Sequence, residues 1–439
     1  MIFVKLDPYC HEELRTLQEV EFVPVEFIPV ILGGDITTYS LARSFHEEYG
    51  VKSVAVSMRK SMMISHSSII ENIIVPDMDN KDRFVERLHG LAGRYPAKKK
   101  LLLACGDWYV RLIVEHKAEL EQDYIIPYIG LELLDRLVLK DSFYSICEEV
   151  GVPYPKTFVY DCKDPQPLDF DFPYPVIAKP ASSAAYHYAK FEGKKKVFRM
   201  KDEAELSAML DKLRAGGYDY KFLIQDTIPG LDYHMHILTV YCDRNGKCRF
   251  FAGGHCLLED NAAMGVGNPV AILSEVNQEL MDHAKRLLEQ VGYTGFANFD
   301  IKYDSRDGSF RFFEINTRLG RSNFYITGSG FNAVKWMVDD LIYEKDFEGE
   351  VVADNTESLY TVVPKDVLTT YIKDEALRQR VVELYAKGGN PSSLMAAFRP
   401  SIQEKSCVHD PLAYAGEKNA LRRLYPAYFM TKQRKKFKA

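Results

Sequence analysis

Residues 295–324 read GFANFDIKYDSRDGSFRFFEINTRLGRSNF, and this stretch predicts a β-hairpin. Residues 296–304 alternate between two faces, residues 305–309 have the composition of a turn, and residues 310–316 alternate again. If Asp304 pairs with Phe310, Asp300 lies opposite Glu314, and Asn298 lies opposite Asn316. Polar side chains then share one face and aromatic ones crowd the other. That separation argues against a hairpin whose charges are merely solvated.

The facing carboxylates of this hairpin predict a metal site. Two carboxylates on adjacent strands repel each other unless positive charge lies between them. Asp300, Glu314 and Asn316 supply the hard oxygen ligands that Mg²⁺ prefers. Arg318 and Arg321 follow on a glycine-containing loop, where they could grip phosphate or carboxylate oxygens in a bidentate manner.

Length and composition indicate an intracellular globular protein. The 439 residues suffice for two or three domains, and the net charge of −6 argues against a general nucleic-acid binder. The eight cysteines show neither CxxC nor zinc spacing, which favours reduced thiols in a cytoplasmic protein. No signal peptide or membrane-spanning run is recognised. The basic residues within 432–438 are most simply a solvated tail; weak attraction to an anionic membrane surface is the alternative.

Apolar runs and helical patterns divide the chain into four predicted segments, with bounds at 1–152, 153–233, 234–350 and 351–439. In the first, strands alternate with helices, which implies a parallel sheet covered on both faces. Its predicted strands are 27–32, 53–57, 69–75 and 100–105, and its predicted helices are 37–49 (capped by Thr37 or Thr38), 82–95, 108–121 and 131–150.

The second and third segments combine strands and helices differently. The second reads as a small α+β module, with strands at 175–180, 196–198 and 221–225 and a helix at 202–215. The third has longer strands at 236–242 and 249–257, a helix at 275–291, the hairpin, and an amphipathic helix at 332–343. The role of residues 351–439 is left open.

Several residues ahead of the hairpin have the chemistry of a nucleotide site. Lys179 ends a buried strand, where an ammonium group is costly unless it meets an anion such as phosphate. Lys140, within a helical stretch, would by itself be interpreted as a surface lysine. The connector at 222–232 could present backbone groups to an adenine edge and Asp232 to ribose hydroxyls, or could be an ordinary interdomain link.

Taken together, the order of these features resembles the ATP-grasp superfamily of carboxylate–amine ligases over residues 27–343. The segments that carry the resemblance are ILGGD at 31–35, LACGD at 103–107, PYPKT at 153–157, QDTIPG at 225–230, GFANFD at 295–300, and FEIN at 313–316 with GRS at 320–322. It implies an α/β and α+β ATP-grasp fold: an N-terminal Rossmann-like parallel-sheet domain, a small central α+β domain and a C-terminal antiparallel-sheet domain. ATP would lie between the last two.

The resemblance also implies roles for individual residues, with ATP and Mg²⁺ as cofactors. It assigns phosphate- and adenine-proximal lysines (Lys140, Lys179), an adenine hinge (Gln225, Asp226, Thr227, Ile228), a ribose-binding acid (Asp232), Mg²⁺ ligands (Asp300, Glu314, Asn316) and an arginine near the transferred phosphate (Arg318).

Within the superfamily the chain is similar to the bacterial D-aspartate ligases, which extend peptidoglycan precursors. This likeness implies that the side-chain carboxylate of D-aspartate is activated as an acyl phosphate. The lysine side chain of a UDP-linked muramyl-pentapeptide would then attack it. Arg321 and Ser322 would hold the second carboxylate of the amino acid.

Two departures and three histidines complicate this interpretation. The segment ASSAAY at 181–186 lacks the glycines with which many relatives cover phosphates, and Asn298 stands where many carry arginine. His234 and His236 share one face of a probable strand, but with no third ligand nearby we expect hydrogen-bonding or packing roles for them and for His255.

Three alternatives remain at this point. One is another ATP-grasp amino-acid or peptide ligase. Another is a biotin-type carboxylase, although those enzymes continue with a Val-Glu-His run where this chain has Leu319 to Asn323. The third is a catalytically idle nucleotide-binding module, which the complete set of metal ligands argues against.

Overall fold

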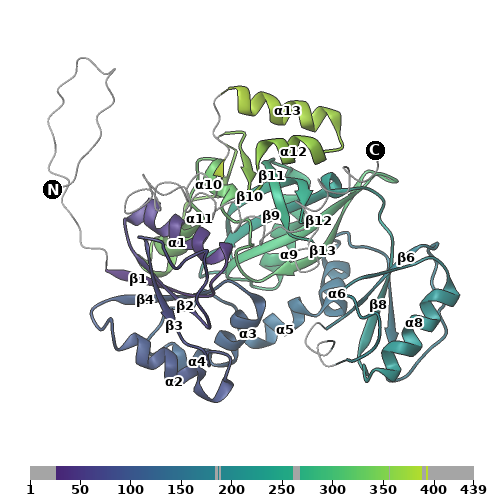
Figure 1. The fold of residues 1–439 in the computed structure, drawn as a ribbon, viewed down its shortest axis with the longest axis horizontal. Coiled ribbons are helices and arrows are strands. Elements are labelled where there is room, and N and C mark those ends of the chain that lie inside the picture. The colour runs from purple at the N-terminus through teal and green to yellow at the C-terminus, as the bar shows by residue number, and fades with distance from the viewer. Residues whose placement is uncertain are drawn as a thin grey trace, which may run out of the picture.

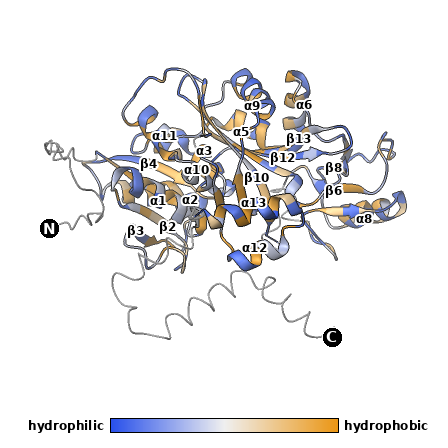
Figure 2. Cartoon of the chain, turned by 90° about the horizontal axis from the view of Figure 1, so that it is seen from above, coloured by the Kyte–Doolittle hydropathy of each residue, from blue (hydrophilic) through white to orange (hydrophobic). Residues whose placement is uncertain are grey.

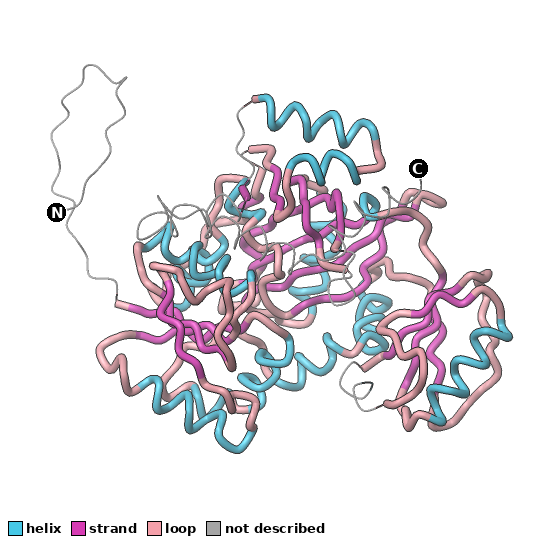
Figure 3. The backbone as a smooth tube through the Cα atoms, viewed as in Figure 1, coloured by secondary structure: helices cyan, strands magenta, loops and turns pink. Residues whose placement is uncertain are grey.

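Three β-sheets organise the chain in the computed structural model, which describes residues 26–182, 186, 189–260, 267–354, 356–387 and 392–393. The N-terminal and central sheets lie at opposite ends of the molecule, and the largest sheet lies between and above them (Figure 1). Figure 3 shows the same three groups of strands. The predicted fold class, an ATP-grasp arrangement of one parallel and two mainly antiparallel sheets, is confirmed.

The first sheet is parallel throughout, in the order β3-β2-β1-β4. Its strands are β1 Phe27–Leu32, β2 Ser53–Ser57, β3 Ile70–Ile74 and β4 Lys99–Ala104, and its helices are α1 Ile36–Tyr49, α2 Lys81–Ala92, α3 Asp107–Glu115 and α4 Lys117–Leu120. Asp35, rather than Thr37 or Thr38, caps α1, because its carboxylate accepts hydrogen bonds from the backbone N–H groups of both threonines. The helix expected at 108–121 is interrupted at His116.

A break at Leu139 divides the helix expected at 131–150 into α5 Leu131–Val138 and α6 Lys140–Val150. Leu139 has φ −76° and ψ 116°, an extended conformation that ends one helix and starts the next. Lys140 is therefore the first residue of a new helix and not a mid-helix surface position. Both helices lie along the path from the N-terminal unit to the central one (Figure 1).

The central sheet is antiparallel, in the order β5-β8-β6-β7. Its strands are β5 Thr157–Asp161, β6 Val176–Pro180, β7 Phe198–Met200 and β8 Lys221–Asp226, and helix α8 Glu203–Ala215 accompanies them. The sequence did not predict β5, which lies directly after the proline-rich break. Asp202 caps α8 by accepting from the backbone N–H of Glu205.

The third sheet has eight strands, six of them in the order β13-β12-β9-β10-β11-β15. These strands are β9 Met235–Cys242, β10 Cys248–Glu259, β11 Pro269–Ser274, β12 Gly295–Asp304, β13 Ser309–Asn316 and β15 Leu359–Thr361, with β14 Val351–Val352 and β16 Ser392–Ser393 paired alongside. The helices are α9 Gln278–Gln290, α10 Tyr325–Gly328, α11 Ala333–Leu341, α12 Lys365–Tyr371 and α13 Glu375–Ala386, with a short 3₁₀ turn, η1, at Asp232–His234. β15 joins the first part of the C-terminal segment to this sheet.

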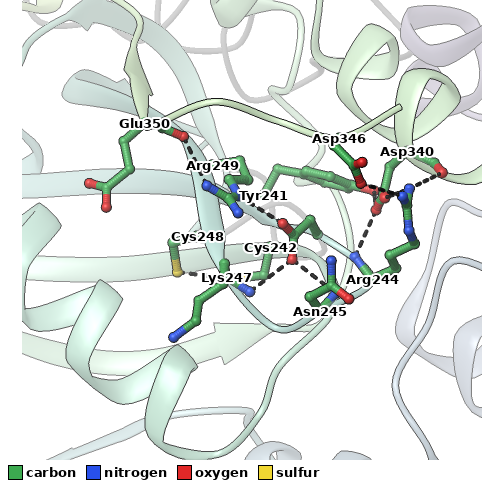
Figure 4. A network of polar contacts seen from close by, with 12 residues as sticks. Tyr241, Cys242, Arg244, Asn245, Lys247, Cys248, Arg249, Asp340, Asp346 and Glu350 are labelled. Atoms are coloured by element: carbon green, nitrogen blue, oxygen red, sulfur yellow. Dashed lines mark hydrogen bonds and ion pairs between the residues drawn. The ribbon is translucent and has the colours of Figure 1, made fainter. Parts of the chain in front are cut away.

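A polar network locks the turn between β9 and β10 (Figure 4). The buried Asp243 accepts a 2.7 Å bond from Arg249 and two bonds from backbone N–H groups inside the turn. Next to it, Asp340 of α11 accepts from the Tyr241 hydroxyl at 2.7 Å and from Arg244 at 2.9 Å. These bonds tie β9, the strand beside the hairpin, to a helix far along the chain.

Apolar packing accounts for the rest of the scaffold. Figure 2 shows hydrophobic residues concentrated on strands such as β4 and β10, and both hydrophobic and hydrophilic residues on the surface helix α8. One core runs from the parallel sheet through α6 and α9 to Phe299 and Phe312 of the hairpin. The hairpin is therefore rigidly backed by apolar contacts on one face. No helix among the described residues is long and apolar enough to cross a membrane.

Candidate active site

The predicted hairpin is present, but the register at its turn differs from the prediction by one residue. Asp304 pairs with Ser309 and not with Phe310 as expected. The strands nevertheless place Asp300 opposite Glu314 and Asn298 opposite Asn316, because the register shifts by one residue between Asp300 and Ile301. This is a β-bulge at Phe313, and bulges re-aim side chains next to functional sites.

The two carboxylates of the hairpin are electrostatically inequivalent. The Lys140 ammonium lies 2.8 Å from Glu314 Oε2 and, as the main cause, holds the pKa of Glu314 well below its ordinary value. Burial, and next the charge of Glu314, raise the pKa of Asp300. Asn316 donates from Nδ2 to Asp300 Oδ2 at 3.3 Å. A cation bound between the two carboxylates would offset their repulsion and the cost of burying a charged Asp300. The donor set therefore fits Mg²⁺.

Lys179 has the character of an anion-binding group. It belongs to β6, and its Nζ lies 5.3 Å from the centre of the Phe313 ring. Burial, and next the charge of Lys140, lower the pKa of Lys179 to about 7. Among the described residues, no carboxylate forms an ion pair with it. An anionic ligand would restore the positive charge, which agrees with the predicted place beside phosphates.

Tyr144 and Gln225 support the backbone of the bulged residue Phe313. The sequence interpretation did not identify Tyr144 and assigned Gln225 to the adenine hinge. The Tyr144 hydroxyl donates to the Phe313 carbonyl at 2.9 Å. Gln225 Nε2 in turn donates to Tyr144 at 3.1 Å and to Thr157 Oγ1 at 2.7 Å. Gln225 Oε1 is buried and has no hydrogen-bond partner among the described residues.

Polar groups of the remaining residues in the predicted adenine hinge form hydrogen bonds with other parts of the protein. Asp226 forms a two-bond ion pair with Arg306, with distances of 3.2 and 2.6 Å. Thr227 Oγ1 donates to the Pro175 carbonyl at 2.5 Å. The Ile228 carbonyl accepts from Lys302 at 3.0 Å. Any contact of this segment with adenine would thus come chiefly from backbone groups that are not already bonded to protein.

Asp232 lies beside an acidic residue that no sequence pattern pointed out. Its Oδ2 accepts from the backbone N–H of Glu259 at 3.1 Å. Burial, and next the charge of Asp232, raise the pKa of Glu259 to about 7. A pair of acidic groups of this kind can accept hydrogen bonds from the hydroxyls of a sugar.

Arg318 is brought to the hairpin, and the N-terminal unit holds it there. Its Nε donates to Asp107 Oδ1 at 2.8 Å, and its Nη1 donates to the Leu319 carbonyl at 3.1 Å. Asp107 is the first residue of α3, directly after β4. The contact of Asp107 with Arg318 joins two segments that are far apart in the chain.

Arg321 and Ser322 are less closely tied to the carboxylates. Arg321 Nη1 lies 3.9 Å from Asp260 Oδ2, at the outer limit of an ion pair. Ser322 is buried. A Cβ at Gly320 would lie 2.9 Å from Asn298 Oδ1, so the close approach of the loop to Asn298 requires glycine there.

The structure therefore gathers Lys140, Lys179, Asp300, Glu314, Asn316 and Arg318 into one cluster, whose members influence one another electrostatically. Gln225 joins it through Tyr144, whereas Asp226, Thr227, Ile228 and Asp232 lie along the adjoining connector. Residues 183–185, half of the segment 181–186 that lacks the usual glycines, and the basic residues within 432–438 lie outside the described residues.

Sequence comparison relates the chain to several ligases. Residues 140–338 match the family described as the ATP binding domain of the carbamoyl-phosphate synthase L chain. The chain is 38% identical over 373 residues to a D-aspartate ligase of Enterococcus faecium, across 82% of this chain and 88% of that protein. It is 26% identical over 205 residues to a D-alanine–D-alanine ligase of Ectopseudomonas mendocina, across 45% of this chain and 61% of that protein.

Solved structures share the architecture. An L-amino acid ligase from Bacillus licheniformis aligns with a TM-score of 0.52 and 14% identity, covering 73% of this chain and 75% of that one. The biotin carboxylase domain of the Hydrogenobacter thermophilus 2-oxoglutarate carboxylase aligns with a TM-score of 0.54 and 14% identity, covering 73% and 71%. At such low identity these likenesses establish the fold alone.

Proposed function

The chain belongs to the ATP-grasp family of carboxylate–amine ligases, and on that premise we propose that it joins the side-chain carboxylate of D-aspartate to an amine. The amine is the lysine side chain of a UDP-linked muramyl-pentapeptide. The similarity to a D-aspartate ligase along most of both chains is the observation that supports this proposal most strongly. The same similarity argues against the biotin-type carboxylase and the idle module.

The clustered side chains have the charges that phosphoryl transfer to a carboxylate requires. Asp300, Glu314 and Asn316 would hold Mg²⁺, which when bound would neutralise negative charge on the phosphates. Lys179 would contact the phosphates of ATP. Arg318 would stabilise the transferred phosphoryl group, because a planar guanidinium binds two oxygens at once.

The proposed reaction proceeds in two steps. A carboxylate oxygen of the amino acid attacks the γ-phosphorus, the bond to ADP breaks, and an acyl phosphate forms. The amine then attacks the acyl carbon, the bond to phosphate breaks, and an amide and inorganic phosphate are released. The protein contributes mainly position and charge, since phosphoryl transfer leaves little covalent work to a side chain.

A dicarboxylic substrate needs one carboxylate held still while the other reacts. We assign that task to Arg321, with Ser322 adding a hydroxyl. The 3.9 Å separation between Arg321 and Asp260 is long for an ion pair and leaves the guanidinium available to a substrate carboxylate.

Comparison of amino acids tests the proposal. With ATP, Mg²⁺ and hydroxylamine, D-aspartate should yield a hydroxamate together with ADP, and L-aspartate, D-asparagine, D-serine and D-glutamate should yield much less. With a lysine-containing muramyl-pentapeptide in place of hydroxylamine, the product mass should show one added aspartyl residue. R321K should raise the KM for the amino acid about tenfold, because a point charge cannot reproduce a bidentate grip.

Each part of the proposal has its own contradicting result. Equal activity with D-asparagine would show that the second carboxylate is not recognised. A preference for L-aspartate would keep the ligase class but refute the proposed substrate. A larger effect of R321K on the KM for ATP than on that for the amino acid would refute the role of Arg321.

A further inference from the structure

Two histidines face each other on the side of the large sheet that is turned away from the Asp300 carboxylate. His236 of β9 pairs with His255 of β10, and on its other side with Ile301 of β12. Asp300 pairs with Ile237, the next residue along β9. Because successive residues of a strand point to opposite faces, the two histidines are separated by the sheet from the nucleotide site. Their rings are stacked, with centroids 4.4 Å apart.

Glu275 completes a cluster of three potential ligands. It follows β11, and its Oε2 lies 2.9 Å from His255 Nδ1. One ligand atom from each of His236, His255 and Glu275 lies within 4.8 Å of the other two. A cavity of about 10 Å³, lined by His236 and Glu275 among others, adjoins them and has room for about one water molecule.

The hydrogen bonds around the cluster orient His255 as a metal ligand. Its Nε2 lies 2.5 Å from the Tyr233 carbonyl and donates to it. Nδ1 faces Glu275 Oε2 in an ion pair, and a bound metal ion would replace the proton between them. Metal-binding histidines usually donate their second ring N–H to a carbonyl or carboxylate in this way. Apart from the ion pair with His255, buried Glu275 Oε2 has no hydrogen-bond donor among the described residues.

We propose that His236, His255 and Glu275 form a binding site for Zn²⁺ or a similar divalent transition metal. Two imidazoles and a carboxylate suit these ions, whereas Mg²⁺ prefers oxygen ligands alone. Zn²⁺ with bonds of about 2.0 Å holds tetrahedral ligand atoms about 3.3 Å apart and lies in the plane of each imidazole, so one of the two stacked rings must rotate out of the stack when the ion binds. A water molecule in the adjoining cavity supplies the fourth ligand.

The site has a structural role. Its ligands come from β9, from β10 and from the segment that leads into α9, so a bound ion cross-links three elements. A Cβ at Gly253 would lie 2.1 Å from the Glu275 carbonyl oxygen, which shows how closely this segment already approaches β10. The inference does not depend on the identity of the ligase substrates.

Calorimetric titration of the full chain with Zn²⁺, after dialysis against EDTA and in excess Mg²⁺, tests the site. Excess Mg²⁺ occupies oxygen-rich sites and leaves imidazole ligands available. The wild type should bind one equivalent of Zn²⁺ and gain thermal stability. H236Q and E275Q should each weaken binding by about 10- to 100-fold. H89Q is the matched control, because His89 also pairs with a carboxylate, at 2.6 Å from Asp123, but belongs to no three-ligand cluster among the residues that the structure describes.

Absence of saturable Zn²⁺ binding, or equal affinity in the wild type, E275Q and H236Q, would overturn the proposal and leave His255 and Glu275 as an ion pair only. Should H236Q fail to fold, Co²⁺ absorption of the wild type and E275Q decides. The wild type should show the intense visible bands of a tetrahedral site, and E275Q should lose them. Weak octahedral bands in both proteins would also overturn it.

Discussion

Asp107 illustrates how one residue of the N-terminal unit can govern a group at the hairpin. Its carboxylate forms an ion pair with Arg318, whose side chain is only 14% exposed. A guanidinium held by one carboxylate keeps its remaining N–H groups in a fixed orientation. This matters because displacing a catalytic group by about 1 Å can lower the rate about 10²-fold. We therefore regard Asp107 as a positioning residue for Arg318.

D107N should lower kcat about tenfold and leave the KM for ATP within about twofold, because the change acts on the orientation of Arg318 and not on nucleotide contacts. Steady-state kinetics with ADP detection measures both constants. D135N is the control, since Asp135 also pairs with an arginine, Arg111, elsewhere on the same unit. An unchanged or increased kcat in D107N would refute the positioning role.

Glu259 predicts a pH dependence of stability. Its pKa is raised from 4.5 to about 7, first by burial and then by Asp232. The unfolded chain therefore loses this proton before the folded one does, so the folded protein loses stability as the pH rises through that interval. E259Q, which resembles the protonated acid, should match the wild type near about pH 5 and melt a few degrees higher near about pH 8. A melting-temperature difference that stays constant with pH would contradict this assignment.

At the scale of elements, the β-bulge in the hairpin creates the carboxylate pair. If regular pairing continued from Asp304 and Ser309 without the bulge, Phe313 and not Glu314 would lie opposite Asp300. Tyr144 of α6 bonds to the carbonyl of this bulged residue. Helix α6 also contributes Lys140, so one helix both fixes the bulge and balances the charge of Glu314.

D300N and E314Q should each abolish turnover but change stability in opposite directions. D300N relieves repulsion at a carboxylate whose pKa is already raised, so the metal-free protein should be equally or slightly more stable. E314Q removes the partner of the largely buried Lys140 and should destabilise the protein by a few kcal/mol. Denaturant unfolding in EDTA measures both effects, and D307N, in the exposed hairpin turn, is the control. Wild-type turnover in either variant would refute the metal site.

At the scale of the whole molecule, one ion pair links the central sheet to the hairpin. Arg306 of the hairpin turn binds Asp226 at the end of β8 and also Asp304 of its own strand. Nucleotide bound between these units would depend on their relative position. The link is a half-exposed ion pair, so its energetic contribution is modest.

R306A should raise the KM for ATP about two- to fivefold with little change in kcat, because loss of an exposed pair costs up to about 1 kcal/mol. Hydrogen exchange at residues 221–226 should become faster. R311A is the matched control, since Arg311 pairs with Asp307 inside the hairpin and links no second unit. Identical kinetics and exchange in R306A and R311A would argue against a role for the link.

Local patterns in the sequence were enough to predict most helices and strands and to identify the candidate ligands. Alternation identified both strands of the hairpin, and apolar runs identified the parallel strands, because both patterns depend only on neighbouring residues. Residue type and order then pointed to Asp300, Glu314, Asn316, Lys179 and Arg318. The chemistry of these side chains is known from the residue type alone, before their contacts are known.

The tertiary structure decided what depends on contacts between distant segments. The bulge at Phe313, the pairing of Lys140 with Glu314 and the grip of Asp107 on Arg318 each join parts of the chain that no local pattern relates. The same is true of Glu275, which reaches His255 only because β10 and β11 pair. Local periodicity specifies which way a side chain faces, but packing of the whole chain specifies which group it meets.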